Sequence, residues 1–168
     1  MTSAEVLADF FGRVKEIVEG VLDGSSPEHL TARLDSEANS IAWLVWHLTR
    51  VQDDHVAHVA GTEQAWTSGG WTERFDLPLE VADIGYGHDS DKVAIVTAGA
   101  DELRGYHEAV YENTSGFLGE LSDADMDRVV DDRWDPPVTL GVRLVSVVAD
   151  DLQHAGQAAF IRGILDRG

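Results

Sequence analysis

Apolar residues recur at intervals of three and four in four segments of the chain, and this spacing predicts four long amphipathic helices. The first expected helix covers residues 4–22. Thr2 and Glu5 have the spacing of a capping box at its start, and the run from Gly24 to Pro27 contains the residues that break it. Its expected core face consists of Val6, Phe10, Val14, Ile17, Val18 and Val21.

The other three helices are expected over residues 40–60, 98–121 and 139–167. Asn39 or Ser40 is expected to cap the start of the second helix, and Gly61 is expected to end it. Thr97 is expected to cap the start of the third helix, and the pair Pro136–Pro137 precedes the fourth. Their core faces are expected to contain Ile41, Leu44, Val45, Leu48 and Val51, then Leu103, Tyr106, Val110, Phe117 and Leu121, and finally Leu140, Leu144, Val147, Val148, Leu152, Ala155, Ala158, Ile161 and Leu165.

Of the three connectors between these helices, the last two contain aromatic residues. Residues 62–96 form a long crossover between the second and third helices, with a short helix expected over residues 90–96, and residues 122–138 form the last connector. The crossover contains aromatic side chains that should pack on the helices: Trp66, Trp71, Phe75 and Tyr86. We therefore predict an all-α four-helix bundle with an up-down-down-up or similar path, and one domain over residues 1–168.

Charge and composition argue against several classes of partner and of metal ligand. The 168 residues include 12 basic and 31 acidic side chains, which gives a net charge of −19, so neither nucleic acid nor a membrane surface is an expected partner. No apolar run approaches the length of a membrane span, and the N-terminus lacks the pattern of a signal peptide. We therefore expect a cytoplasmic protein. The absence of cysteine excludes disulfides and thiolate metal ligands.

A metal site in this chain would have to use histidines and carboxylates. Asp150 and His154 lie four residues apart, hence on one face of the fourth helix, and that face is expected to point inward. His47 lies in the most apolar stretch of the second helix. These three side chains would supply two nitrogens and one oxygen and would leave coordination positions open, as in catalytic sites. Asp151, three residues from His154, is a rival to Asp150.

Each of these features also has a simpler interpretation. An isolated Asp–His pair is more often a helix-surface contact, and an isolated histidine in an apolar stretch is more often a core residue. Asp54, His55 and His58 also have ligand spacing, but their polar surroundings favour a solvated face. The remaining histidines have no companion at ligand spacing and are expected at the surface or in loops: His29, His88 and His107.

Three motifs together resemble the DinB-like superfamily, and most of all its mycothiol-dependent metalloenzymes. They are the tract from Asn39 to Leu48, Gly85-Tyr86-Gly87-His88, and the tract from Asp150 to Gln157. The resemblance spans nearly the whole chain and implies a DinB-like four-helix bundle with a metal held by His47, Asp150 and His154. Many relatives carry His or Glu where this chain has Asp150, whose shorter side chain leaves the metal's identity open.

The resemblance also implies an enzyme that transfers a thiol, activated on a divalent metal, to an electrophile. Zinc is the first choice of metal, with nickel, iron and manganese as alternatives, and mycothiol or another small thiol is the expected co-substrate. A homodimer is an expected assembly. Weaker candidates are Tyr86, His88 and Gln157 for catalysis and Trp43 and Arg50 for contacts with the cofactor. The alternatives are a metal-dependent hydrolase, a non-haem iron centre, and a non-catalytic stress-response bundle with a vestigial site.

Overall fold

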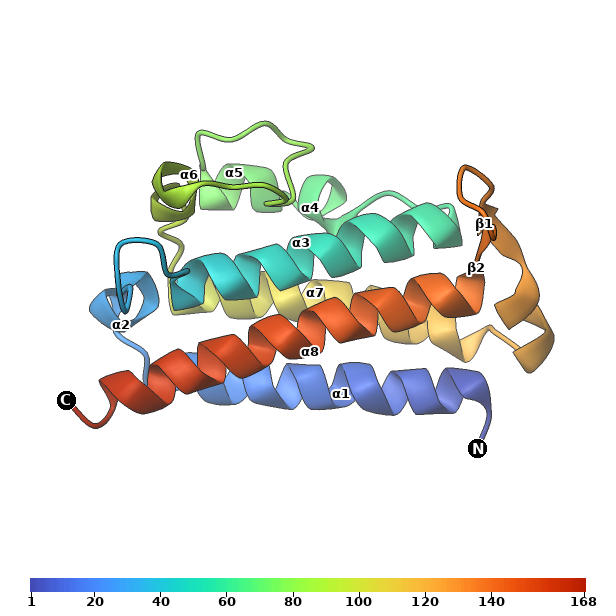
Figure 1. Ribbon diagram of the computed structural model, residues 1–168, viewed down its shortest axis with the longest axis horizontal. Coiled ribbons are helices and arrows are strands. Elements are labelled where there is room, and N and C mark those ends of the chain that lie inside the picture. Colours follow the sequence, from blue (N-terminus) through green and yellow to red (C-terminus); the bar gives the residue numbers. More distant parts are fainter.

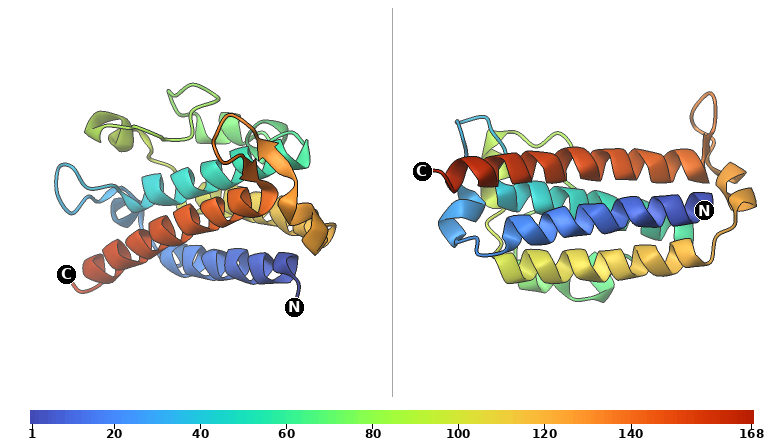
Figure 2. Two further views of the ribbon diagram at one scale, coloured as in Figure 1. Left: turned by 45° about the vertical axis from the view of Figure 1, so that its right-hand side comes forward. Right: turned by 90° about the horizontal axis from the view of Figure 1, so that it is seen from below.

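The computed structural model describes residues 1–168 and is mostly helical, as predicted (Figure 1). Four long helices lie side by side: α1 (Ser3–Leu22), α3 (Ile41–Ala60), α7 (Ala100–Gly119) and α8 (Leu140–Leu165). α8 packs against α1 and α3, and α7 packs against the same two helices. Figure 2 shows that α1 and α8 run in one direction while α3 and α7 run in the other. None of these helices combines the length and the apolar character that a membrane span requires.

The helix ends agree with most of the caps expected from the sequence. Thr2 and Glu5 form the capping box of α1, and the Ser40 hydroxyl accepts a hydrogen bond from the Trp43 backbone N–H at the start of α3. Gly61 ends α3 with a left-handed φ of 70°. The expectation for Thr97 was wrong, because α7 begins after Gly99 and has no side-chain cap.

The connectors contain short elements that helical periodicity cannot reveal, because each is only a few residues long. They are α2 (Pro27–Thr31), α4 (Ala65–Ser68), α5 (Trp71–Phe75), α6 (Ser90–Ile95), a 3₁₀ turn η1 (Asp123–Asp127), β1 (Val129–Asp131) and β2 (Val138–Thr139). Only α6 was predicted. β1 and β2 pair antiparallel, with Val129 opposite Thr139. Figure 1 shows that the crossover from α4 to α6 lies along α3.

The expected core face of α1 was partly wrong. Val6 and Phe10 are each 39% exposed, whereas Leu7 and Phe11 are buried in their place. The cause is that α1 carries apolar side chains on two adjacent stripes, and periodicity alone does not say which stripe faces the neighbouring helices.

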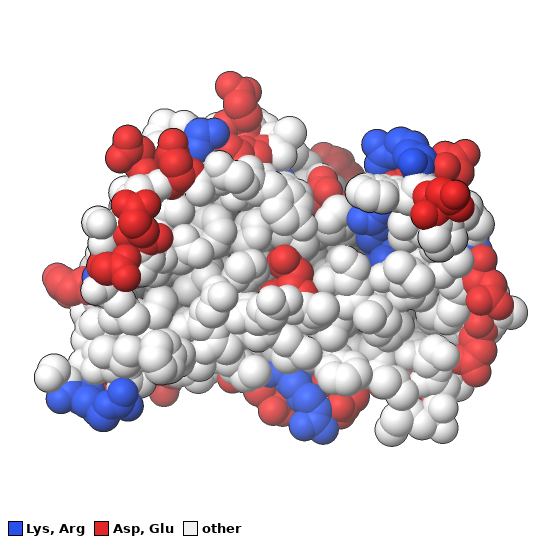
Figure 3. Space-filling view, in the orientation of Figure 1, with Lys and Arg blue, Asp and Glu red and all other residues white.

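The face of the molecule that carries α8 has few charged side chains, and most of its acidic groups lie around the edge (Figure 3).

Arg50 of α3 is fully buried and ties the crossover to the long helices. Its guanidinium donates hydrogen bonds to Gln64 Oε1 at 2.8 Å and to the Tyr106 hydroxyl at 3.2 Å. It also donates to the backbone carbonyls of Val81 and Asp83, both at 3.3 Å. A buried guanidinium is tolerated when its N–H groups are satisfied in this way. These contacts hold both ends of the crossover against α3.

Asp53, one turn after Arg50, completes this anchor from the same helix. Its carboxylate accepts hydrogen bonds from the backbone N–H groups of Ala65 and Trp66, at 2.9 and 2.8 Å, and from the Tyr106 hydroxyl at 2.8 Å. The two amides belong to the start of α4. Asp53 therefore fixes where the crossover leaves α3.

His107 of α7 is a core residue, which corrects the expectation that it lies at the surface or in a loop. Its side chain is buried, and its Nε2 atom has no hydrogen-bond partner. Burial penalises the charged imidazolium and lowers the pKa of His107 from its ordinary 6.5 to about 4. The folded protein therefore keeps this ring neutral over a pH range in which an unfolded chain would protonate it.

This difference predicts a pH dependence of stability. As the pH falls from 6.5 towards 4, the unfolded chain binds a proton at His107 that the folded protein does not, so the free energy of unfolding should decrease. His107→Leu should remove up to roughly 3 kcal/mol of that decrease. Urea unfolding of both proteins across this range measures the difference, with pH 8 as the reference condition. Parallel curves for the two proteins would contradict the prediction.

Candidate metal site

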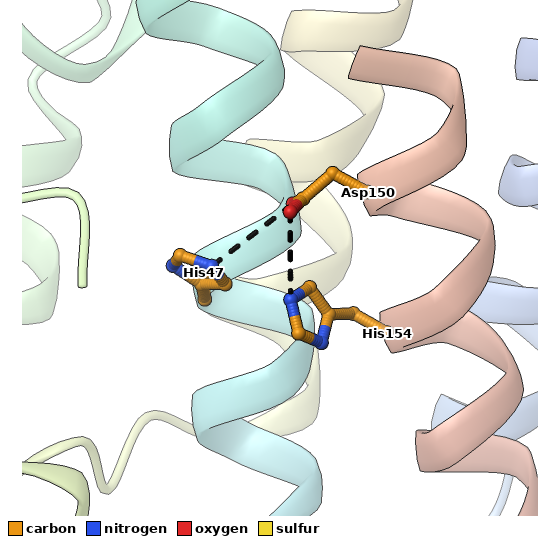
Figure 4. Close-up of side chains that lie close together, drawn as sticks. All are labelled: His47, Asp150 and His154. Carbon is orange, nitrogen blue, oxygen red and sulfur yellow. Dashed lines mark ion pairs between the residues drawn. The ribbon is translucent and has the colours of Figure 1, made fainter. Parts of the chain in front are cut away.

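His47 of α3 faces Asp150 and His154 of α8 across the contact between these two helices (Figure 4). One ligand atom from each side chain lies within 4.8 Å of the other two. His47 Nε2 is 4.0 Å from Asp150 Oδ2, and His154 Nε2 is 3.7 Å from Asp150 Oδ1. The structure therefore brings together the three residues selected from the sequence. It contains no other group of three such side chains within this range.

Hydrogen bonds set the tautomers of both imidazoles. His47 Nδ1 lies against the backbone carbonyl oxygen of Ile84, which can only accept, so Nδ1 carries the proton. His154 Nδ1 makes the equivalent contact with Gln157 Oε1 at 3.0 Å. In both rings the Nε2 lone pair is then free and directed towards Asp150. This is the arrangement in which a histidine binds a metal, with its other nitrogen held by an acceptor.

Burial keeps His47 in the neutral form that a ligand requires. The side chain is 3% exposed, and this burial lowers the pKa of His47, although the hydrogen bond to Ile84 acts in the opposite direction. The neighbouring His154 lowers that pKa further. Asp150 Oδ2 is buried and has no hydrogen-bond partner. Such an unpaired carboxylate oxygen is unfavourable unless a positive charge or a donor faces it.

The three side chains lie near the spacing that a divalent cation requires. Metal–ligand bonds of about 2.0–2.2 Å with tetrahedral angles place neighbouring ligand atoms roughly 3.3–3.6 Å apart. The separations from the Asp150 carboxylate, 4.0 Å between Oδ2 and His47 and 3.7 Å between Oδ1 and His154, and the 4.8 Å limit that contains one ligand atom of each residue are longer than this, so the side chains would have to close around a bound cation. Two nitrogens and one oxygen fit zinc and also the other first-row metals, and they leave at least one coordination position open.

Asp151, the rival to Asp150, is not part of this group. Its side chain is fully buried, and neither of its carboxylate oxygens has a hydrogen-bond partner. Burial, with a further contribution from Asp150, raises the pKa of Asp151 well above its ordinary value and so favours the neutral carboxyl group, a poorer metal ligand than a carboxylate. Asp150 is thus the carboxylate that stands beside the two histidines.

Trp43, one turn before His47, forms a wall of the site. Its ring stacks on the His47 imidazole with 4.5 Å between centroids and a 15° angle, and it meets the His154 ring edge-on. Its indole N–H donates to His88 Nδ1 at 3.1 Å. His88 in turn donates from Nε2 to the carboxylate of Asp83, at 2.9 and 3.0 Å. The candidate cofactor contact at Trp43 therefore lies directly beside the predicted ligands.

The structure places the remaining candidate site residues in different surroundings. Tyr86 is 60% exposed and meets the His47 ring edge-on at 5.4 Å, so it lies at the entrance to the site. Gln157 orients His154. The His88 side chain is 1% exposed between Trp43 and Asp83, and Arg50 is fully buried among crossover contacts. His88 lies in a loop, as expected, but its side chain and that of Arg50 are enclosed by protein contacts in this arrangement, and their proposed roles towards a substrate stay predictions.

The second histidine cluster stays apart from the site. His58 is exposed, and Asp54 accepts a hydrogen bond from Gln64 Nε2 at 2.8 Å. His55 Nδ1 lies 3.7 Å from Asp54, and burial lowers the pKa of His55. These residues do not converge on one point, so the cluster gives no comparable site.

Two crossover residues that sequence reasoning missed, Asp83 and Ile84, support His47 together with Gly85 of the predicted motif. Gly85 has a φ of 97°, and a Cβ atom on it would lie 2.5 Å from His47 Nδ1. This position requires glycine for both reasons. A backbone carbonyl acceptor leaves no mark on a sequence, and the Gly85–His88 motif was the one available signal.

Comparison with known proteins gives two findings. The sequence matches the family model described as Mycothiol-S-transferase over residues 6–167, a range that contains every residue of the candidate site. A solved structure described as a conserved protein from Enterococcus faecalis is 29% identical to this chain, with a TM-score of 0.88, and the match covers 96% of each chain. No curated protein matches the sequence.

The two glycines of the crossover motif offer a matched test of this packing. Gly85 and Gly87 both have positive φ, but a Cβ atom at Gly87 would meet nothing within 4 Å. Gly85→Ala should therefore lower the free energy of unfolding by about 1–3 kcal/mol more than Gly87→Ala, because it adds a clash to the same backbone strain. Urea unfolding measures both. Equal losses would show that the contact with His47 is not tight.

Proposed function

The chain belongs to the mycothiol-S-transferase family, as its motifs indicated, and we propose that it is a metal-dependent thiol S-transferase. The observation that supports metal dependence is the His47–Asp150–His154 group, in which two neutral imidazoles and one unpaired carboxylate oxygen face one another. The four long helices then serve as a DinB-like bundle, in one domain, that holds this group between α3 and α8.

A divalent cation bound here supplies a positive charge that favours the thiolate form of a small thiol over the thiol, whose ordinary pKa is about 8.5. The chain's own residues hold the reactants. His47 and His154 keep their Nε2 lone pairs directed inward, Asp150 offsets positive charge, and the Trp43 ring excludes water from one side.

With a quinone, the thiolate sulfur would add to a ring carbon, the electron pair would move to the carbonyl oxygen and that oxygen would take up a proton. With an alkyl halide or an epoxide, the transfer is a displacement at carbon. The thiolate sulfur forms a bond to the electrophilic carbon, the bond from that carbon to the leaving group breaks, and the leaving group keeps the electron pair. The thiol proton goes to solvent. Tyr86, at the entrance to the site, would donate a hydrogen bond to the leaving group, and burial together with the Asp150 charge raises the pKa of its hydroxyl and keeps it protonated.

The finer assignments rest on the ligand types of the site and on the family resemblance. Zinc is the metal we propose first, with nickel, iron and manganese as alternatives for a two-nitrogen, one-oxygen set. Mycothiol is the proposed thiol, and an epoxide, alkyl halide or quinone is the proposed class of electrophile. We further propose that the protein is cytoplasmic and works as a homodimer.

The ligand set makes a direct prediction about metal content. His47→Ala and His154→Ala should each reduce bound zinc from about one ion per chain to a small fraction, because each removes one of three protein ligands. Asp150→Asn should weaken binding, whereas His58→Ala should leave it unchanged. Elemental analysis of protein purified without a metal-binding tag measures this. Full occupancy in either of the first two variants would mean that the ligand set is wrong.

Activity separates the candidate reactions. The zinc-loaded protein should consume thiol when given a model alkyl halide, and Tyr86→Phe should lower kcat by about 10–100-fold while zinc content stays unchanged. Thiol loss followed with a thiol-reactive dye measures the rate. Ester or amide turnover without thiol would favour a hydrolase instead, and a protein that folds fully without metal and consumes no thiol would favour the vestigial alternative.

A further inference from the structure

Asp83 lies at the origin of two chains of contacts that both end on His47. It belongs to the crossover, far from α3 in sequence, and its side chain is 17% exposed. Its carboxylate accepts from His88 Nε2 and from the Gly85 backbone N–H, the latter at 2.8 Å. These bonds outweigh the effect of burial and lower the pKa of Asp83, so it is a carboxylate. Lys92 lies 4.0 Å away and is largely exposed.

The first chain of contacts runs through side chains and has only one possible direction. The indole N–H of Trp43 can only donate, so His88 Nδ1 must accept and His88 Nε2 must carry the proton that Asp83 accepts. The Trp43 ring, held at its N–H in this way, stacks on the His47 imidazole. Asp83 therefore sets the plane in which the His47 ring lies.

The second chain runs through the backbone. By accepting from the Gly85 N–H, Asp83 closes a tight turn of three residues whose middle member is Ile84. That turn directs the Ile84 carbonyl onto His47 Nδ1, and Gly85 packs against the same ring with no space for a side chain. Asp83 therefore also sets which His47 nitrogen is free.

We propose that Asp83 is a positioning residue for the metal site: without touching His47, it fixes both the ring plane and the tautomer of that ligand. His88 joins Asp83 to Trp43 in this arrangement. Its role is therefore to position Trp43, in place of the catalytic role first considered. The inference rests on the proposed metal dependence of the site and adds a residue to it from outside α3 and α8.

Asp89 provides a matched control in the same segment. It caps α6 by accepting from the Lys92 backbone N–H at 3.0 Å, and its carboxylate has no hydrogen bond to His88 or Gly85. Asp83→Ala and Asp89→Ala each remove a carboxylate that hydrogen-bonds the crossover. Both should cost stability, but only Asp83→Ala should change His47.

The test measures zinc affinity by competition with a chromophoric chelator, and the visible spectrum of the cobalt-loaded protein as a report on ligand geometry. Asp83→Ala should weaken zinc binding by about 10–100-fold and shift the cobalt bands, as the loss of an outer hydrogen-bond partner does elsewhere. Asp89→Ala should leave both unchanged. Asp83→Asn, which keeps one acceptor oxygen, and Trp43→Phe, which keeps the stack but not the N–H, should give intermediate losses.

The outcomes distinguish this inference from the proposed function. A wild-type protein that binds no zinc would overturn the proposed function itself. A wild type that binds zinc, with Asp83→Ala binding it as tightly and with unchanged cobalt bands, would overturn the positioning role alone. An equal loss in Asp89→Ala would also overturn it, because the effect would then come from general loosening of the crossover.

Discussion

The contact between α3 and α8 carries a group of polar side chains that a helix interface normally excludes. His47 is almost fully buried there, and Asp150 Oδ2 has no partner. Burying such atoms costs free energy that apolar residues in the same places would not cost. The surrounding helix faces compensate, because Leu44, Leu48, Val147 and Ala155 are completely or almost completely buried around them. A well-packed core therefore holds a site that would not be stable by itself.

The crossover between α3 and α7 is the second determinant of the site. Arg50 and Asp53 hold it against α3 through buried hydrogen bonds, and the turn from Asp83 to Gly85 then reaches His47. The two ligands on α8 need no such support, since one turn of helix separates them. The site thus combines a rigid half from α8 with a half whose orientation depends on a long irregular segment.

Sequence reasoning reached the parts of this structure that follow a period. The four long helices follow from apolar spacing, and Asp150 and His154 follow from the four-residue interval. It did not reach what depends on tertiary contact: the buried positions of Arg50, His88 and His107, the buried stripe at Leu7 and Phe11, or the carbonyl of Ile84. A charged or titratable side chain shows its type in the sequence, but its burial depends on partners supplied by other segments.

The site also links distant parts of the polypeptide. His47 lies in the first third of the sequence, while Asp150 and His154 lie near its end. A cation bound to all three would act as a reversible staple that encloses most of the chain in one loop, in a protein that has no cysteine to form a permanent one. Because the three side chains come together only in the folded protein, a cation would bind the folded chain and be released on unfolding. Its occupancy would therefore add to the free energy of unfolding as well as supply the chemistry of the site.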